Sequence, residues 1–229
     1  MASRRRRGLI IGGLVVLVLL LAGAGAVAWY AFGDDAPPPP TLGDAPVADA
    51  QHAGSPDGTW KLGAKPGYVG YRVQELFAGE TLHKDAVGRT SAVTGTIVFA
   101  NSQLQSVNVT ADVQALKSDR APRDSFLHSN ALETDRYPTG TFQAINPALP
   151  APPASGKAFA VGLTGDLTLH GVTRRITLQL RARRVGDRID VVGTAPVLFR
   201  DYNIQTPDTA IVKTEDHGDL EIDLTFRRA

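Results

Sequence analysis

Apolar and polar residues alternate through most of the chain after residue 58, a pattern typical of half-buried β-strands. In 159–169 the odd positions hold Phe, Val, Leu, Gly, Leu and Leu, and the residues between them are small or polar. The same alternation predicts strands at 107–113, 176–182 and 220–226. We expect each of these strands to turn its apolar residues toward one shared core.

Further strands with weaker alternation are predicted at 59–64, 68–77, 93–101, 140–145 and 188–200. The total is about nine strands, and the short links His170-Gly171 and Gly186-Asp187 predict antiparallel hairpins. Long strands with one apolar face favour a closed antiparallel barrel over a sandwich, because closure leaves no exposed edge strand. The exception is 122–132, where a proline at the first turn and an apolar stripe predict a short helix that closes one mouth of the barrel.

The start of the chain combines a basic tail with a long apolar run. Arg4 to Arg7 precede the uncharged run 8–32, and a membrane-spanning helix needs about 20 such residues. The next charges, Asp34 and Asp35, are acidic, so the positive-inside rule predicts a cytoplasmic tail at 1–7 and an extracytoplasmic position for everything after the run. We expect a transmembrane helix, a signal anchor, at 8–32 and a single-pass protein of the cell membrane. The alternative is a cleaved signal peptide, because Ala24-Gly25-Ala26 would serve as a cleavage site.

Residues 33–57 are rich in Asp, Ala, Gly and Pro, with Pro37 to Pro40 consecutive. This stretch has no periodic apolar pattern, so it predicts a Pro/Ala-rich linker stiffened by polyproline II structure. The globular domain is then expected at 58–229.

The composition removes several classes of function. The chain has no cysteine, which excludes disulfides, thiolate chemistry and a lipidated cysteine anchor. The net charge of +1 includes the four arginines of the tail, so the part beyond the membrane holds 20 of the 24 basic residues against 23 acidic ones, a balance near −3. Without a basic excess there is no electrostatic basis for binding nucleic acid. No feature of the sequence indicates an oligomeric state.

No motif of a familiar catalytic site is present: the chain has no G-x-S-x-G, H-E-x-x-H or P-loop, and its 5 histidines are scattered without ligand spacing. We therefore predict neither catalytic residues nor a metal site. The acidic stretch 215–219 is interpreted as a solvated turn, with a weak cation site as the alternative. The arginine groups 174–175 and 181–184 form a basic stripe, most of which is interpreted as a solvated outer face, with contact to anionic headgroups as the alternative.

Two Arg-Asp pairs are candidates for structural ion pairs. Arg123 and Asp124 lie at the start of the predicted helix, and Arg200 and Asp201 lie at the end of the strand predicted at 188–200. We interpret the first pair as a salt bridge that holds the helix over the barrel mouth, and the second as a similar structural pair. The alternative for both pairs is a clamp for a substrate.

Several ordered motifs identify a family resemblance. The most specific is 165–173, Gly-Asp-Leu-Thr-Leu-His-Gly-Val-Thr, and the segments 59–62, 93–99, 123–127, 137–142 and 199–204 accompany it in order and spacing. Over about residues 58–227 the chain resembles the YceI-like, polyisoprenoid-binding-protein-like family. This resemblance implies a lipocalin-like antiparallel barrel whose elongated apolar cavity can hold an isoprenoid chain.

The inward positions of the predicted strands include small residues, among them Gly95, Gly165, Gly193 and Ala111. An eight-stranded barrel is just wide enough to be packed solid or to hold one small ligand, so small inward residues favour a ligand cavity. The residues expected to line this cavity are Ile97, Phe99, Val109, Leu163, Gly165, Leu167 and Ile222.

Three functions follow from these observations. We expect a membrane-tethered extracytoplasmic domain that binds an isoprenoid-type or other long-chain lipid, needs no further cofactor and is not an enzyme. The first alternative is a ligand-free protein of envelope stress or assembly that acts by contact. The second alternative is an enzyme acting on a lipid through Asp124 or Asp201.

Overall fold

The computed structural model describes residues 36–43, 54–77, 82–149, 156–210 and 212–229. The basic tail and the membrane helix predicted at 1–7 and 8–32 lie outside these residues. Among the residues that are described, no helix has both the length and the apolar character needed to cross a membrane. Pro37 to Ala229 form one compact unit.

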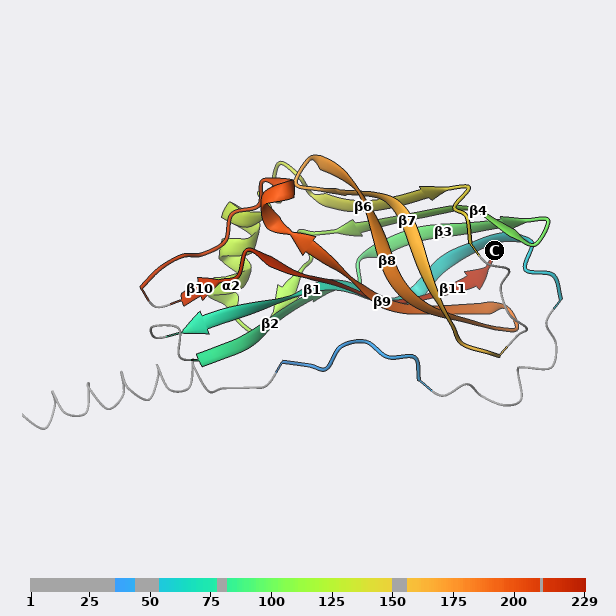
Figure 1. Ribbon diagram of the computed structural model, residues 1–229, viewed down its shortest axis with the longest axis horizontal. Helices are drawn as coiled ribbons and strands as arrows, with labels where there is room; N and C mark the ends of the chain where they lie inside the picture. Colours follow the sequence, from blue (N-terminus) through green and yellow to red (C-terminus); the bar gives the residue numbers. More distant parts are fainter. Residues whose placement is uncertain (1–35, 44–53, 78–81, 150–155, 211) are drawn as a thin grey trace, which may run out of the picture. The chain divides into compact units, whose positions relative to one another are not determined.

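Eight strands close into an antiparallel barrel, as the alternation predicts (Figure 1). Each strand pairs with the next in the ring, and the last, β11, pairs with the first, β1. The ring consists of β1 (Gly58–Phe77), β3 (Val93–Ala100), β4 (Gln103–Asp112), β6 (Thr139–Ile145), β7 (Phe159–Leu169), β8 (Val172–Val185), β9 (Arg188–Leu198) and β11 (His217–Arg228).

The strands predicted at 59–64 and 68–77 are a single strand, β1. Its register against β11 shifts between Leu62 and Gly67, so the strand continues through an irregularity. Gly67 has φ +94°, and a Cβ there would lie 2.0 Å from the carbonyl oxygen of Asp223. Only glycine allows so close an approach with this backbone conformation.

The strand predicted at 188–200 is shorter than expected. β9 ends at Leu198, and the 3-10 helix η3 (Phe199–Tyr202) follows.

Three strands were missed in the sequence: β2 (Leu82–Thr90), β5 (Lys117–Ser118) and β10 (Val212–Thr214). β2 and β10 pair with the second half of β1, and β5 pairs with β2. β2 has no apolar alternation because its inner face consists of Ala86, Gly88 and Thr90. The Tyr71 ring fills the place of the missing side chain, since a Cβ on Gly88 would lie 2.3 Å from it.

The predicted hairpin at His170-Gly171 is confirmed. These two residues join β7 to β8 with φ of 48° and 72°, and Leu169 pairs directly with Val172. Positive φ at both central positions is the requirement of a type I′ turn, which matches the twist of the two strands.

The helix predicted at 122–132 consists of α2 (Ala121–Phe126) followed by the π-helix η2 (Leu127–Ala131). Together we call these residues the lid. Leu132, directly after η2, belongs to a small apolar cluster with Val113 and Leu116, against which Leu127 and Tyr71 pack. The lid thus covers the end of the barrel at which β1 and β4 finish, which we call the lid end (Figure 1).

The described part of the predicted linker is bound to the outer wall of the barrel. Arg72 donates from Nη2 to the carbonyl of Pro37 at 2.5 Å, and Arg89 donates from Nη2 to that of Pro38 at 3.1 Å. Further along, Arg183 donates from Nη1 to the carbonyl of Gly43 at 2.7 Å. We call residues 37–43 the strap.

Candidate functional site

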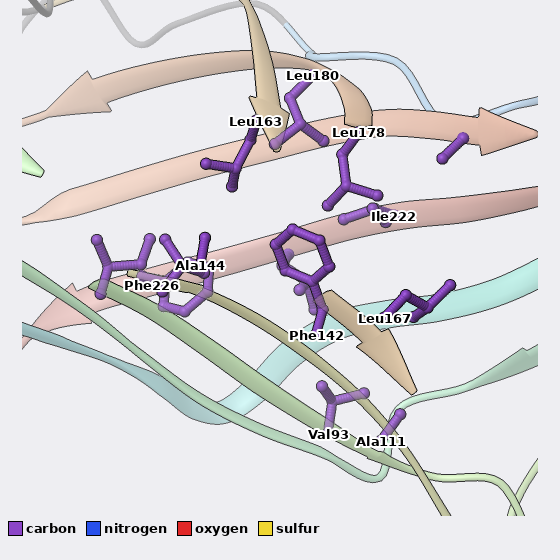
Figure 2. Packing of buried hydrophobic residues seen from close by; sticks show 14 of the residues in the cluster. Val93, Ala111, Phe142, Ala144, Leu163, Leu167, Leu178, Leu180, Ile222 and Phe226 are labelled. Atoms are coloured by element: carbon purple, nitrogen blue, oxygen red, sulfur yellow. The ribbon is translucent and has the colours of Figure 1, made fainter. Parts of the chain in front are cut away.

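The inner face of the barrel is a continuous apolar surface built by the period-two alternation of every strand. Buried side chains from all eight strands of the ring form one cluster, and Figure 2 shows Phe142, Leu163 and Leu178 pointing into it from β6, β7 and β8. Partly buried apolar residues pack against the cluster toward both ends. Such a surface can bind an apolar molecule by shape and desolvation, without polar chemistry.

The residues expected to line the cavity lie on this inner face. Leu163, Leu167, Ile97 and Ile222 retain 5%, 3%, 6% and 6% of their exposure. The others are Phe99 and Val109, which are partly buried, and Gly165, which is buried. Direct pairing places Val109 beside Phe142, and Phe142 beside Leu167. The alternation therefore assigns the faces of β3, β4, β7 and β11 as the structure has them.

Side chains of neighbouring residues occupy the spaces beside the inward glycines. A Cβ on Gly165 would lie 2.5 Å from Cζ of Phe142, and one on Gly193 would lie 2.8 Å from Cδ2 of Leu180. At Gly95 the nearest side chains, Leu62 and Val109, lie at 3.2 Å. The spaces that the sequence analysis assigned to a ligand are thus partly filled by the protein itself.

The two ends of the inner face of β8 carry arginines. Arg174 pairs with Leu167 of β7, and Arg184 pairs with Ile189 of β9, so both belong to the inward phase of the strand. Arg175, Arg181 and Arg183 alternate with that phase and belong to the outer wall. The expectation that most of the stripe forms a solvated outer face fits Arg175 and Arg181, which are exposed. The strand register, which the composition does not reveal, places Arg174 and Arg184 in the inward phase, and Arg183 on the outer wall is only 7% exposed.

Arg123 holds the lid to β1. Its Nε and Nη2 donate to Oε1 and Oε2 of Glu75 at 2.9 and 2.8 Å, and Nη1 also bonds to Asp119. Asp124 instead accepts from the backbone N–H and the hydroxyl of Ser118 at 2.9 and 2.7 Å. Arg123 is therefore a structural ion-pair residue, as expected for its position, but its partners are Glu75 and Asp119 and not Asp124.

The short helix η3 presents different residues to solvent and to the core. Arg200 and Asp201 are exposed, whereas Tyr202 retains 2% of its exposure within the apolar cluster. Nδ1 of His170 lies 3.0 Å from the carbonyl oxygen of Tyr202 and fixes η3 against the β7–β8 hairpin. The sequence drew attention to Arg200 and Asp201 and not to Tyr202, although Tyr202 lies within the same motif, 199–204.

One acidic group brings possible cation ligands together. Ligand atoms of Glu215, Asp216 and His217 lie within 4.8 Å of one another, and Nδ1 of His217 is 3.0 Å from Oδ1 of Asp216. The hydrogen bond to His217 lowers the pKa of the Asp216 carboxyl. The three residues lie at the surface where β11 begins, and exposed acidic groups of this kind are common without a metal, in keeping with the solvated turn expected from the sequence.

These features define a class of protein, the small closed β-barrels with an apolar interior and a helical lid. Within that class, the chain belongs to the YceI-like domain family, whose model matches residues 60–226.

Relatives and solved structures agree with this assignment. The chain is 28% identical to protein YceI of Shigella flexneri over 148 residues, which are 61% of this chain and 71% of that protein. A polyisoprenoid binding domain from Saccharophagus degradans superimposes with a TM-score of 0.57 at 17% identity, over 74% of this chain and 98% of that one. BcnA of Burkholderia cenocepacia gives a TM-score of 0.51 at 20% identity, over 68% of this chain and 95% of that one. At these identities the structural neighbours establish the fold alone.

Proposed function

We propose that this protein is a membrane-tethered, extracytoplasmic domain that binds an isoprenoid-type lipid inside its barrel. The observation that carries the proposal is the inner face, which is apolar between its two ends and includes side chains of every strand in the ring. The polyisoprenoid binding domain that shares this fold supports a prenyl chain as the ligand.

The length of the ligand follows from the energetics of burial. Burying about ten methylene groups at about 0.8 kcal/mol each provides about 8 kcal/mol, which corresponds to about micromolar affinity before the cost of association is subtracted. A short acyl chain should therefore dissociate during purification, whereas a long prenyl chain should be retained. The inner residues Val109, Phe99 and Leu167 would contact such a chain.

The membrane tether is part of the proposal. The run 8–32 would span the bilayer, with the arginine tail 1–7 in the cytoplasm and the barrel outside. This arrangement would keep the barrel close to a source of apolar lipid.

A second candidate is a protein that acts by contact and holds no ligand. It is favoured by Phe142 and Leu180, which occupy the spaces beside Gly165 and Gly193. An enzymatic role has less support, because Asp124 is held by Ser118 and Asp201 is exposed on the outside of η3.

Lipid extraction separates the two candidates. The full chain is purified from its own membranes in mild detergent, extracted with organic solvent and analysed by mass spectrometry. We expect a long prenyl lipid in near-stoichiometric amount. Val109→Phe, which enlarges a partly buried inner residue, should reduce the bound lipid. Thr110→Phe, the neighbour on the outer face, should leave it unchanged.

Absence of lipid from the wild-type protein would favour the contact protein and refute the lipid-binding proposal. Equal retention of lipid by a folded Val109→Phe variant would show that the lipid lies outside the barrel. The fold of both variants is checked by far-UV circular dichroism.

A further inference from the structure

A hydroxyl group without a partner lies inside the apolar core at the lid end. Tyr202 is only 2% exposed, and its Oη has no hydrogen-bond partner among the described residues. A buried hydroxyl without a partner is unfavourable, and native structures satisfy almost all such groups. The Tyr202 hydroxyl therefore indicates a polar atom that belongs to something other than the described chain.

The backbone at Tyr202 is fixed by several contacts. Nδ1 of His170 lies 3.0 Å from the Tyr202 carbonyl oxygen, and the Tyr137 ring packs edge-on against His170 with centroids 4.7 Å apart. The next residue, Asn203, has a left-handed backbone and donates its N–H to the Arg200 carbonyl. With the backbone held in this way and the ring buried in the apolar cluster, the hydroxyl is kept away from solvent.

Arg174 lies at the same end of the barrel as this hydroxyl, and its guanidinium has no acidic partner among the described residues. It occupies the inward phase of β8 opposite Leu167, at the lid end, and its side chain is exposed. Within the described part of the chain its one hydrogen bond runs from Nη1 to the carbonyl of Thr173 at 3.3 Å, and it forms no ion pair there. By contrast, its neighbour Arg175 on the outer face is paired with Asp166 at 3.1 Å.

We propose that Tyr202 and Arg174 form the polar end of the lipid site and select a prenyl lipid whose head carries an oxyanion, such as a phosphate. This inference rests on the proposed function and adds the orientation and head chemistry of the ligand. The head would lie at the lid end, where the Tyr202 hydroxyl donates to a head oxygen and the Arg174 guanidinium contacts the anionic oxygens. The prenyl tail would extend along Leu167 and Val109 toward the opposite end of the barrel.

The charges near Tyr202 are compatible with this assignment. Burial raises the pKa of the Tyr202 phenol, Arg174 acts to lower it, and Asp201 raises it by a smaller amount. The phenol is thus a neutral donor, and the nearby positive charge outweighs the negative one. A guanidinium is well suited to phosphate oxygens, because its planar donors match their geometry.

The test uses three prenyl probes on the delipidated full chain in detergent. They are geranylgeranyl phosphate, geranylgeraniol of the same chain length, and the longer hydrocarbon squalene, which carry an anionic head, a hydroxyl head and no oxygen. We expect the wild type to bind the phosphate more tightly than the alcohol, and squalene serves as the probe without a head group. Arg174→Gln should weaken the binding of geranylgeranyl phosphate by about tenfold to a hundredfold and have little effect on the binding of squalene. Tyr202→Phe should weaken the binding of both the phosphate and the alcohol by about tenfold and leave the binding of squalene unchanged.

Matched variants separate this role from a structural one. Arg175→Gln removes a neighbouring exposed charge on the outer face, and Tyr68→Phe removes a hydroxyl from a tyrosine of the outer wall; both should bind like the wild type. If the wild type binds the probes but shows no preference for the phosphate, the head-group inference is wrong while lipid binding stands. The same holds if Arg174→Gln and Tyr202→Phe keep the wild-type preference, in which case the hydroxyl is satisfied by water. Failure of the wild type to bind any of the three probes would instead overturn the proposed function.

Discussion

Glu221 is a buried carboxylate on the outer wall of the barrel, and its replacement should reveal how strongly that wall is held together. Its side chain is 1% exposed and lies between two arginines of neighbouring strands. Oε1 accepts from Nε of Arg72 at 2.7 Å, and Oε2 accepts from Nη2 of Arg89 at 2.9 Å. The contact with Arg72 links β11 to β1, and the contact with Arg89 links β11 to β2 across Gly70 of β1, where a side chain would collide with Arg89.

The substitution Glu221→Gln keeps the shape of the side chain and removes its charge. Removing one partner of a buried ion pair typically costs about 3–5 kcal/mol, because the other charge stays buried without compensation. Arg72 retains Asp85 at 2.8 Å and Arg89 is 25% exposed, so we expect the lower end, about 3 kcal/mol. The free energy of unfolding is measured in urea by far-UV circular dichroism on the full chain in detergent. If Glu221→Gln lowered the free energy of unfolding by less than about 1 kcal/mol, the Glu221 contacts would be no stronger than surface ion pairs, and the stabilising role given to them would be refuted.

Asp223, two residues along the same strand, provides the control. Burial raises its pKa, and the nearby Asp190 raises it further against a smaller lowering by Arg89. A raised pKa means that, as the pH falls, the folded chain binds this proton at a higher pH than the unfolded chain does. Above the folded pKa the charged carboxylate therefore lowers the free energy of unfolding, and this destabilisation disappears as the pH falls toward 3.8, the pKa of the unfolded chain. Asp223→Asn should therefore be at least as stable as the wild type at neutral pH, and any advantage should vanish at low pH. A loss like that of Glu221→Gln would show that any change of charge on β11 is damaging.

Three further outcomes are expected. Arg123→Gln should lower the free energy of unfolding by about 3 kcal/mol, because Glu75 stays buried without its partner. Arg136→Gln, at an exposed pair, should lower it by only about 0–1 kcal/mol. Equal effects of the two substitutions in urea unfolding would contradict the role given to the lid ion pair. Leu167→Asp should cost more than about 4 kcal/mol by burying a charge, and Thr168→Asp should be mild; similar damage at both would refute the face assignment. Protease added to intact spheroplasts should release the barrel while a tag at residue 1 stays protected, and a mature protein beginning near residue 29 would instead indicate cleavage.

The alternation predicted the inner faces well because it is a local signal. In β7, for example, Leu163 and Leu167 are buried as their phase requires, whatever the partner strands are. The prediction failed where faces depend on distant partners. β2 has a small inner face because Tyr71 fills it from β1, so no apolar period marks it as a strand. Glu221, the partner of Arg72, and Glu75, the partner of Arg123 on β1, lie 149 and 48 residues away, and no spacing rule connects them. Only Asp119, four residues before Arg123, lies at a spacing that the sequence could have indicated.

The strap shows most clearly what local composition leaves out. Glu221, Val192 and Arg183 lie on the outer phases of three adjacent strands, where an isolated barrel exposes its side chains, yet they retain only 0%, 4% and 7% of their exposure. A cover over this wall accounts for the burial, and the strap, whose carbonyls bond to Arg72, Arg89 and Arg183, provides it. A polyproline-type backbone makes no internal hydrogen bonds, so its carbonyls remain available to arginine donors on a folded surface. The prolines that predict a stiff spacer in the sequence are therefore equally suited to a docked segment, and the folded unit begins at Pro37 because the wall beneath the strap supplies the donors.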